Sequence, residues 1–165
     1  MKRIILVRHA KAEDRDFYKD DLSRDLKKQG KEDARLISLA LKGELVKPDL
    51  IISSHASRAI QTARIYAETL HYLESQIQIV EDLYNDMDSH DFINLIHKID
   101  ESHNTIFIFG HNPTIYYLAT DILPSYNHDM PTCTTIGIDF NIETWEDIKL
   151  RQGTLGFRLT PHLYK

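Results

Sequence analysis

Three short apolar runs, each followed at once by polar residues, set the framework of this sequence. They occupy residues 4–7, 50–53 and 105–109. Continuous apolar runs of this length are typical of strands that are buried on both faces of a parallel sheet. We therefore predict three core strands. The residues that follow them are the first candidates for function, because open α/β sheets place their chemistry at the carboxyl ends of their strands.

Between these runs, apolar residues recur every three or four positions, which predicts helices. One helix begins near residue 31 and ends at Gly43, and others cover residues 57–70, 89–99 and 113–122. Ser57 and Ser89 are placed to cap the second and the third of these helices, and Pro113 suits the first position of the fourth. Strands that alternate with helices predict an α/β fold with a mainly parallel sheet.

The C-terminal part of the chain has a different pattern. Apolar and polar side chains alternate in residues 134–142 and 146–159 around a turn at 141–145, which predicts an antiparallel hairpin. This hairpin, together with a short edge strand at residues 76–80, makes the predicted sheet mixed. No repeat, low-complexity tract or linker interrupts the chain, so we expect a single domain covering residues 1–165.

Composition narrows the possible partners. Hydrophobic residues make up 42% of the 165 residues, and 20 basic against 25 acidic side chains give a net charge of −5. This balance offers no basic surface, so we expect neither nucleic acid nor a membrane as a partner. No apolar stretch approaches the roughly 18 residues of a membrane span, and the N-terminus lacks the pattern of a signal peptide. We therefore expect a cytoplasmic protein, and nothing in the sequence argues against a monomer.

Metal and redox chemistry find little support in the sequence. Cys133 is the single cysteine, which leaves no thiol cluster for zinc and no intrachain disulfide. No spacing typical of metal ligands is found among seven of the histidines, which are His55, His71, His90, His97, His103, His128 and His162. We expect no metal and no cofactor.

The three strand ends carry a cluster of cationic and imidazole side chains. Arg8 and His9 end the first run, Arg58 lies in the first turn of the helix after the second, and His111 follows the third. Arginine presents a rigid fork of donors that matches phosphate oxygens, and helix N-termini add N–H groups that favour anions. An imidazole in such surroundings is able to attack phosphorus and carry a phosphoryl group. The sequence therefore predicts a phosphate site at one edge of the sheet.

Three ordered motifs resemble the signatures of the histidine phosphatase (phosphoglycerate mutase-like) superfamily. The motifs are Val-Arg-His-Ala at residues 7–10, Ser-Arg-Ala-Ile-Gln-Thr-Ala at 57–63 and Gly-His-Asn-Pro at 110–113. The short chain and the Arg-His-Ala variant are most similar to the SixA-type phosphohistidine phosphatase branch. The resemblance implies a three-layer α/β/α sandwich with a mainly parallel mixed sheet.

The resemblance also implies roles for residues of this chain. His9 becomes the nucleophile that is phosphorylated, Arg8 and Arg58 become phosphate clamps, and His111 becomes the second imidazole on the phosphoryl oxygens. Asn112 is implied to help bind the substrate, and Ser57 to assist by capping its helix. The implied partner is a phosphorylated substrate, and the SixA-type resemblance implies a protein that bears phosphohistidine.

The sequence departs from the superfamily pattern in two places. Ala10 replaces the usual glycine after the first histidine, which is a mild change. Asn85 stands where many members have a glutamate that acts as a general acid, and an amide does not donate a proton as an acid does. Asp86 and Asp88 are the remaining candidate acids. Because an alkoxide leaving group needs such a proton and an imidazole needs it less, we expect a preference for phosphohistidine, a phosphoramidate.

Three other interpretations remain open at this level. A phosphomonoesterase acting on a small metabolite requires Asp86 or Asp88 as acid and a closed pocket, whereas a protein substrate requires a shallow site. A non-catalytic phosphate-binding module needs only the arginines, so two histidines argue against it. A mutase is the least favoured, because the chain is short. The polar stretch at residues 11–25 is predicted to be a solvated loop that governs access to the site.

Overall fold

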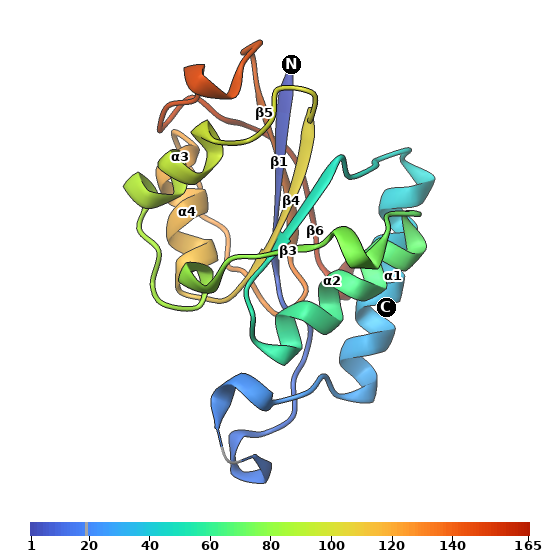
Figure 1. The fold of residues 1–165 in the computed structure, drawn as a ribbon. Coiled ribbons are helices and arrows are strands. Elements are labelled where there is room, and N and C mark those ends of the chain that lie inside the picture. Colours follow the sequence, from blue (N-terminus) through green and yellow to red (C-terminus); the bar gives the residue numbers. More distant parts are fainter. Residues whose placement is uncertain (19) are drawn as a thin grey trace.

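The computed structural model describes residues 1–18 and 20–165, and it is built on one mixed sheet of six strands (Figure 1). The strands lie in the order β3-β2-β4-β1-β5-β6. Their bounds are Lys2–Arg8 for β1, Leu50–Ser53 for β2, Gln78–Ile79 for β3, Thr105–Gly110 for β4, Thr135–Phe140 for β5 and Thr154–Leu159 for β6. The helices are α1 (Lys28–Gly43), α2 (Ser57–Thr69), α3 (Ser89–His97) and α4 (Thr114–Ile122).

The helices cover both faces of the sheet, with α1 and α2 on one side and α3 and α4 on the other (Figure 1). Successive residues of β1 explain these layers, because side chains of a strand point alternately to opposite faces. Ile4 belongs to the core that α3 and α4 cover, and Ile5 belongs to the core that α1 and α2 cover. Both side chains are fully buried. The predicted α/β/α sandwich is therefore confirmed.

The pairing of the strands brings the three predicted polar ends to one edge of the sheet. β1 runs parallel to β4 with Arg8 opposite Gly110, and β2 runs parallel to β4 with Ser53 opposite Phe109. β5 pairs with β1 in the antiparallel direction and then with β6. The residues that follow β1, β2 and β4 therefore lie beside one another.

The C-terminal hairpin is present, but its second strand starts later than the alternation predicts. β6 begins at Thr154 rather than at residue 146. Residues Trp145–Asp147 form a 3-10 turn instead, and Trp145 and Ile148 are buried against the α3 and α4 side of the core. The apolar residues in this stretch reflect a loop that plugs the end of the core and not the face of a strand.

Two helix caps also differ from prediction. Ala56, not Ser57, is the N-cap of α2, because the Ala56 carbonyl accepts hydrogen bonds from the N–H groups of Ala59 and Ile60. Ser57 is the first helical residue. Asp88, not Ser89, is the N-cap of α3, and its carboxylate accepts a hydrogen bond from the Asp91 N–H at 2.8 Å.

The polar stretch after β1 forms an ordered cover in its described residues and not only a solvated loop. We call residues 11–27 the entry loop. It contains the 3-10 turns Arg15–Phe17 and Asp21–Ser23, and Ala12 pairs with Leu26 in a β-bridge that closes its base. Figure 1 shows this loop beyond the carboxyl ends of the strands. In the part of the chain that the structure describes, no helix has the length and apolar character needed to cross a bilayer.

Candidate active site

The four side chains predicted to form the site come together at the carboxyl edge of the sheet. Arg8 ends β1 and His9 follows it, His111 follows β4, and Arg58 lies in the first turn of α2. The ring centroids of His9 and His111 are 5.2 Å apart. His9, Arg58 and His111 are buried and Arg8 is half-buried. Two guanidinium groups and two imidazoles therefore share one largely dehydrated site.

His9 is held as a neutral imidazole with a defined tautomer. Its Nδ1 lies 2.7 Å from the carbonyl oxygen of Ala10. Because a carbonyl oxygen only accepts hydrogen bonds, we assign the ring proton to Nδ1, which leaves the lone pair on Nε2. Burial, followed by the charges of Arg58 and Arg8, lowers the pKa of His9 to about 4, although the bond to Ala10 works in the opposite direction. The ring is thus uncharged at neutral pH, with Nε2 unprotonated.

His111 is also neutral and is fixed by a serine at the end of β2. Its Nε2 lies 2.8 Å from the hydroxyl oxygen of Ser54, which also accepts a hydrogen bond from the N–H of Ala56. Burial, the neighbouring His9 and Arg58 lower the pKa of His111 to about 3. The rings of His111 and Tyr84 are nearly perpendicular, with their centroids 5.4 Å apart.

Three buried nitrogen atoms at the site have no hydrogen-bond partner among the described residues. They are Nε of Arg8, Nε of Arg58 and Nδ1 of His111. Leaving a buried polar group unpaired costs about 1–3 kcal/mol, so such groups are rare in folded proteins unless a ligand or water satisfies them. Three of them beside two imidazoles are suited to the oxygen atoms of a phosphoryl group.

The second motif also ties the site together through residues that follow Arg58. Thr62 lies one turn further along α2, and its hydroxyl oxygen accepts a hydrogen bond from the Ala10 N–H at 3.0 Å. The same hydroxyl donates to the carbonyl oxygen of Arg58 at 2.7 Å. α2 is therefore bound directly to the backbone that follows His9, which fixes the position of Arg58 relative to His9.

Asn112 and Ser57, which the resemblance adds to the site, occupy different positions. The Asn112 amide nitrogen donates to the carbonyl oxygen of Met130 at 3.1 Å, and Nη1 of Arg8 donates to that same oxygen at 2.9 Å. The Asn112 side-chain oxygen is buried without a partner among the described residues. Asn112 therefore lies in the Arg8 environment, whereas Ser57 is a half-buried residue at the start of α2 and forms no cap.

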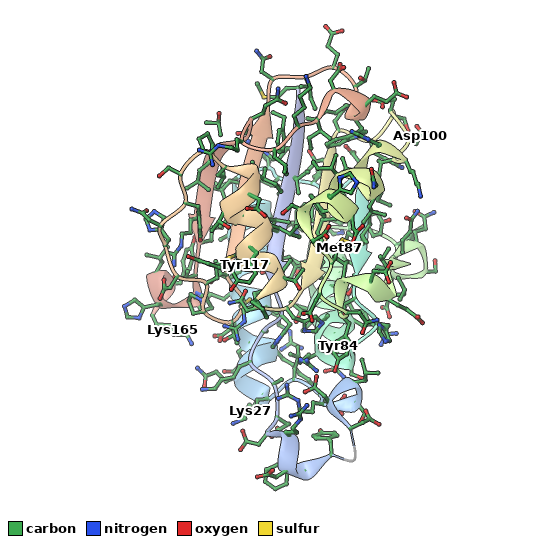
Figure 2. All side chains as sticks on the ribbon, turned by 90° about the vertical axis from the view of Figure 1, so that its left-hand side faces the viewer. Lys27, Tyr84, Met87, Asp100, Tyr117 and Lys165 are labelled. Carbon is green, nitrogen blue, oxygen red and sulfur yellow. The ribbon has the colours of Figure 1, made fainter. Side chains whose placement is uncertain are left out.

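Among the described residues, neither candidate acid forms a hydrogen bond or an ion pair with the two site histidines. Asp88 is occupied as the cap of α3. Asp86 lies in the preceding turn with a left-handed backbone, at φ 56°. Both line a groove between α3 and α4 that also includes Pro113 and Tyr117 and has a volume of about 420 Å³. In Figure 2, Tyr84 lies at a level between Lys27 of the entry loop and the residues Met87 and Tyr117.

A carboxylate that sequence reasoning assigned to an ordinary loop does reach the site. Asp21, in the entry loop, accepts hydrogen bonds from Arg58 and from the Tyr84 hydroxyl. Burial alone would raise the pKa of Asp21, but the bonds donated by Tyr84 and Arg58 outweigh it and hold that pKa well below its usual range. Asp21 is therefore ionised and is unsuited to be a proton donor. No local pattern distinguishes it from the other entry-loop acids, because its partners are distant in sequence.

The fold and the site define the class of protein, an α/β phosphate-handling enzyme. The family model of the histidine phosphatase superfamily (branch 1) matches residues 4–92, and the chain belongs to this superfamily. Its activity is that of a phosphatase, as the sequence motifs predict.

Similar structures and a similar sequence cover nearly the whole chain. The protein histidine phosphatase SixA, solved with tungstate, superimposes with a TM-score of 0.84 at 22% identity and 99% coverage of both chains. A structure assigned to phosphohistidine phosphatase SixA from Agrobacterium tumefaciens gives a TM-score of 0.79 at 26% identity, covering 97% of this chain and 98% of that one. An uncharacterised chloroplastic protein of Arabidopsis thaliana is 27% identical, covering 96% of this chain and 75% of the plant protein. The likeness to the Agrobacterium structure agrees with the SixA branch that the short chain and its motifs predict.

Proposed function

We propose that this protein is a phosphohistidine phosphatase that transfers a phosphoryl group to Nε2 of His9 and then to water. The observation that carries the proposal is the state of His9. Its Nδ1–H is bound to the Ala10 carbonyl, its pKa is lowered to about 4, and its Nε2 keeps a lone pair beside two arginines. A neutral imidazole fixed in one tautomer is a competent nucleophile without an auxiliary base.

The first step forms a bond between Nε2 of His9 and phosphorus and breaks the bond between phosphorus and the leaving nitrogen. Arg8 and Arg58 bind the phosphoryl oxygens, and their positive charges stabilise the negative charge of the transition state. His111 provides a hydrogen bond to the same oxygens when Ser54 donates to its Nε2, since the ring proton is then on Nδ1. In the second step a water oxygen attacks phosphorus, which releases inorganic phosphate and a proton and restores His9.

The preference for a phosphoramidate rests on the carboxylates around the site. Asp21 is ionised. Asp86 and Asp88 line the groove between α3 and α4 and, among the described residues, form no hydrogen bond or ion pair with the site histidines. An alkoxide leaving group without general-acid assistance loses about 10²–10⁴-fold in rate. A phosphohistidine takes up a proton on its other ring nitrogen from solvent, because an imidazole has a pKa of about 6.5, and in that form it releases a neutral imidazole without a general acid. The leaving-group argument therefore favours a phosphoramidate, and within that class we propose a phosphohistidine carried by a protein.

The proposed site draws Arg8, His9, Arg58 and His111 from one chain. The proposal accordingly needs no second copy, and we take a monomer with one domain over residues 1–165 as the active unit. It also needs no cofactor, because the arginines and histidines supply the charge and the nucleophile.

Rapid-quench mass spectrometry after mixing with phosphoramidate tests the nucleophile. We expect wild type to gain the mass of one phosphoryl group transiently, with fragmentation placing it on His9, and His9→Ala to show neither adduct nor turnover. His97→Ala, which removes an exposed imidazole, is the matched control and should behave like wild type. Equal turnover in wild type and His9→Ala would eliminate the covalent mechanism.

A comparison of leaving groups tests the substrate class. We expect kcat/KM for a phosphohistidine peptide to exceed that for an alkyl phosphate by about 10²-fold or more, since only the alkyl phosphate requires a proton donor. Asp86→Asn and Asp88→Asn should leave both values unchanged. Comparable rates on the two substrates, with a loss of ester hydrolysis in either aspartate variant, would instead establish a phosphomonoesterase.

A further inference from the structure

The two terminal nitrogens of the Arg58 guanidinium are bound by a residue of the entry loop. Its Nη1 donates to the backbone carbonyl oxygen of Asp21 and its Nη2 donates to the Asp21 carboxylate, each at 2.7 Å. The Arg58 side chain is 6% exposed and that of Asp21 is 16% exposed. One residue of the entry loop therefore holds two of the three guanidinium nitrogens and leaves only Nε without a partner among the described residues.

Asp21 is itself held from two other directions. The oxygen that accepts from Arg58 also accepts from the Tyr84 hydroxyl at 2.7 Å. The other carboxylate oxygen accepts from Nε of Arg24 at 2.9 Å. The carboxylate thus joins the entry loop, the start of α2 and the segment after β3, and its hydrogen-bonding capacity is largely used.

The entry loop is tied to α2 a second time, one turn beyond Arg58. The Gln61 side-chain oxygen accepts from the Leu26 N–H at 2.8 Å, and its amide nitrogen donates to the Asp25 carboxylate at 2.7 Å. Arg24 also donates to the carbonyl oxygen of Glu13 across the loop at 3.0 Å. Asp21 is therefore presented to Arg58 by a braced segment and not by a free side chain.

Two functions are compatible with a carboxylate on a phosphate-binding arginine. It either occupies the position of the phosphoryl group and competes with it, or it holds the arginine in place while the substrate binds elsewhere on the guanidinium. A competitor would be expected to leave readily, whereas Asp21 has partners on Arg58, Tyr84 and Arg24 as well as a backbone contact. Nε of Arg58 is the guanidinium nitrogen that stays without a hydrogen-bond partner among the described residues.

We infer that Asp21 is a positioning residue, which fixes the guanidinium plane of Arg58 through Nη1 and Nη2 so that Nε is directed to the phosphoryl group. This inference rests on the proposed function of Arg58. It makes the placement of Asp21 by the entry loop a condition for an aligned phosphate clamp. Positioning of this kind contributes most where charge develops in the transition state, so its loss lowers kcat more than it raises KM.

Kinetics of three variants with phosphoramidate test the inference. We expect Asp21→Ala to lower kcat by about 10–100-fold with a smaller change in KM, and Asp21→Asn, which keeps an oxygen acceptor, to lie between Ala and wild type. Asp16→Asn removes the same charge from an exposed position of the same loop and should match wild type. Unchanged or increased kcat in both Asp21 variants would overturn the inference.

Binding of inorganic phosphate, measured by calorimetry, gives a readout that needs no turnover. A positioned Arg58 predicts weaker phosphate binding in Asp21→Ala and Asp21→Asn, whereas a competing carboxylate predicts tighter binding, which would contradict the positioning role. If wild type neither turns over phosphoramidate nor forms an adduct, the proposed function fails while phosphate binding still decides the role of Asp21. If Asp21→Ala fails to fold, Asp21→Asn, which keeps the volume of the side chain, tests the role of Asp21.

Discussion

The imidazole rings of His9 and His111 lie with their centroids 5.2 Å apart and their planes inclined at 53°, although they come from opposite halves of the chain. The register of two parallel strands produces this proximity. Arg8 is opposite Gly110, and the His9 N–H donates to the Gly110 carbonyl oxygen at 3.0 Å. His9 and His111 are the residues that directly follow this pair. Because both rings are buried beside arginines, neither is charged at neutral pH.

The stability of the protein should fall on acidification because of these two histidines. Burial above all lowers the pKa of His9 to about 4 and that of His111 to about 3, below the value near 6.5 of an unfolded chain. The unfolded state therefore binds more protons below about pH 6.5, so the stabilisation is complete above that pH and is lost as pH falls through about 4. We expect each ring to lower the free energy of unfolding on the order of 2 kcal/mol between pH 7 and pH 4.5.

Urea unfolding at the two pH values measures this effect. His9→Gln and His111→Gln lack the titrating ring and should each show a shallower dependence on pH, whereas His97→Gln, at an exposed position, should retain the slope of wild type. Identical slopes in all four proteins would mean that the two rings titrate normally in the folded state.

Ser54 should contribute to the orientation of His111. Ser54→Ala removes the hydroxyl that lies 2.8 Å from Nε2 of His111, and a hydrogen bond of this kind contributes about 0.5–1.5 kcal/mol. We therefore expect kcat to fall by up to about tenfold with little change in folding. Ser53→Ala is the matched control, because the hydroxyl of Ser53 bonds to the Ser54 carbonyl and not to the ring. Equal kcat values for the two variants would mean that Ser54 does not contribute to the orientation of His111.

Gly30 should be sensitive to the smallest possible enlargement. A Cβ at this position would lie 2.1 Å from the carbonyl oxygen of Lys11, so the first turn of α1 and the entry loop would have to separate. We expect Gly30→Ala to lower the free energy of unfolding by about 1–3 kcal/mol and to reduce activity. Gly43→Ala lies at the other end of α1, where nothing stands within 4 Å of the added carbon, and should be neutral or slightly stabilising. Thermal unfolding of both variants measures this difference. Equal destabilisation of the two would contradict the explanation by close packing at Gly30.

Lys2 should affect stability without affecting catalysis. Its ammonium group is buried at the far end of β1 and donates to the carbonyl oxygens of Glu101 and His103 and to the Asn104 side chain. Lys2→Met leaves these acceptors unsatisfied, which we expect to cost about 1–3 kcal/mol of unfolding free energy. Lys31→Met, at an exposed position, is the control for the lost charge. A fall in kcat of folded Lys2→Met, at a temperature well below its unfolding transition, would contradict the expectation that Lys2 affects stability alone.

The hydrophobic pattern anticipates the layers of the fold but not every element boundary. Runs such as residues 4–7 can only be buried between helices, so they predict β1, β2 and β4 directly. The alternation that begins at residue 146 predicts strand instead of the buried turn at Trp145–Asp147, because periodicity reports burial and does not distinguish a strand face from a loop that plugs a core.

The sequence by itself determined the α/β class, the family and the grouping of Arg8, His9, Arg58 and His111, because parallel strands necessarily bring the residues that follow them to one edge. Only the tertiary structure decided that Asp21 pairs with Arg58, that Ser54 meets His111 and that both rings are neutral. These relationships depend on contacts between segments that are far apart in the chain and on burial within them. Hydrophobic spacing records which side chains leave water, and it does not record which polar partners they meet there.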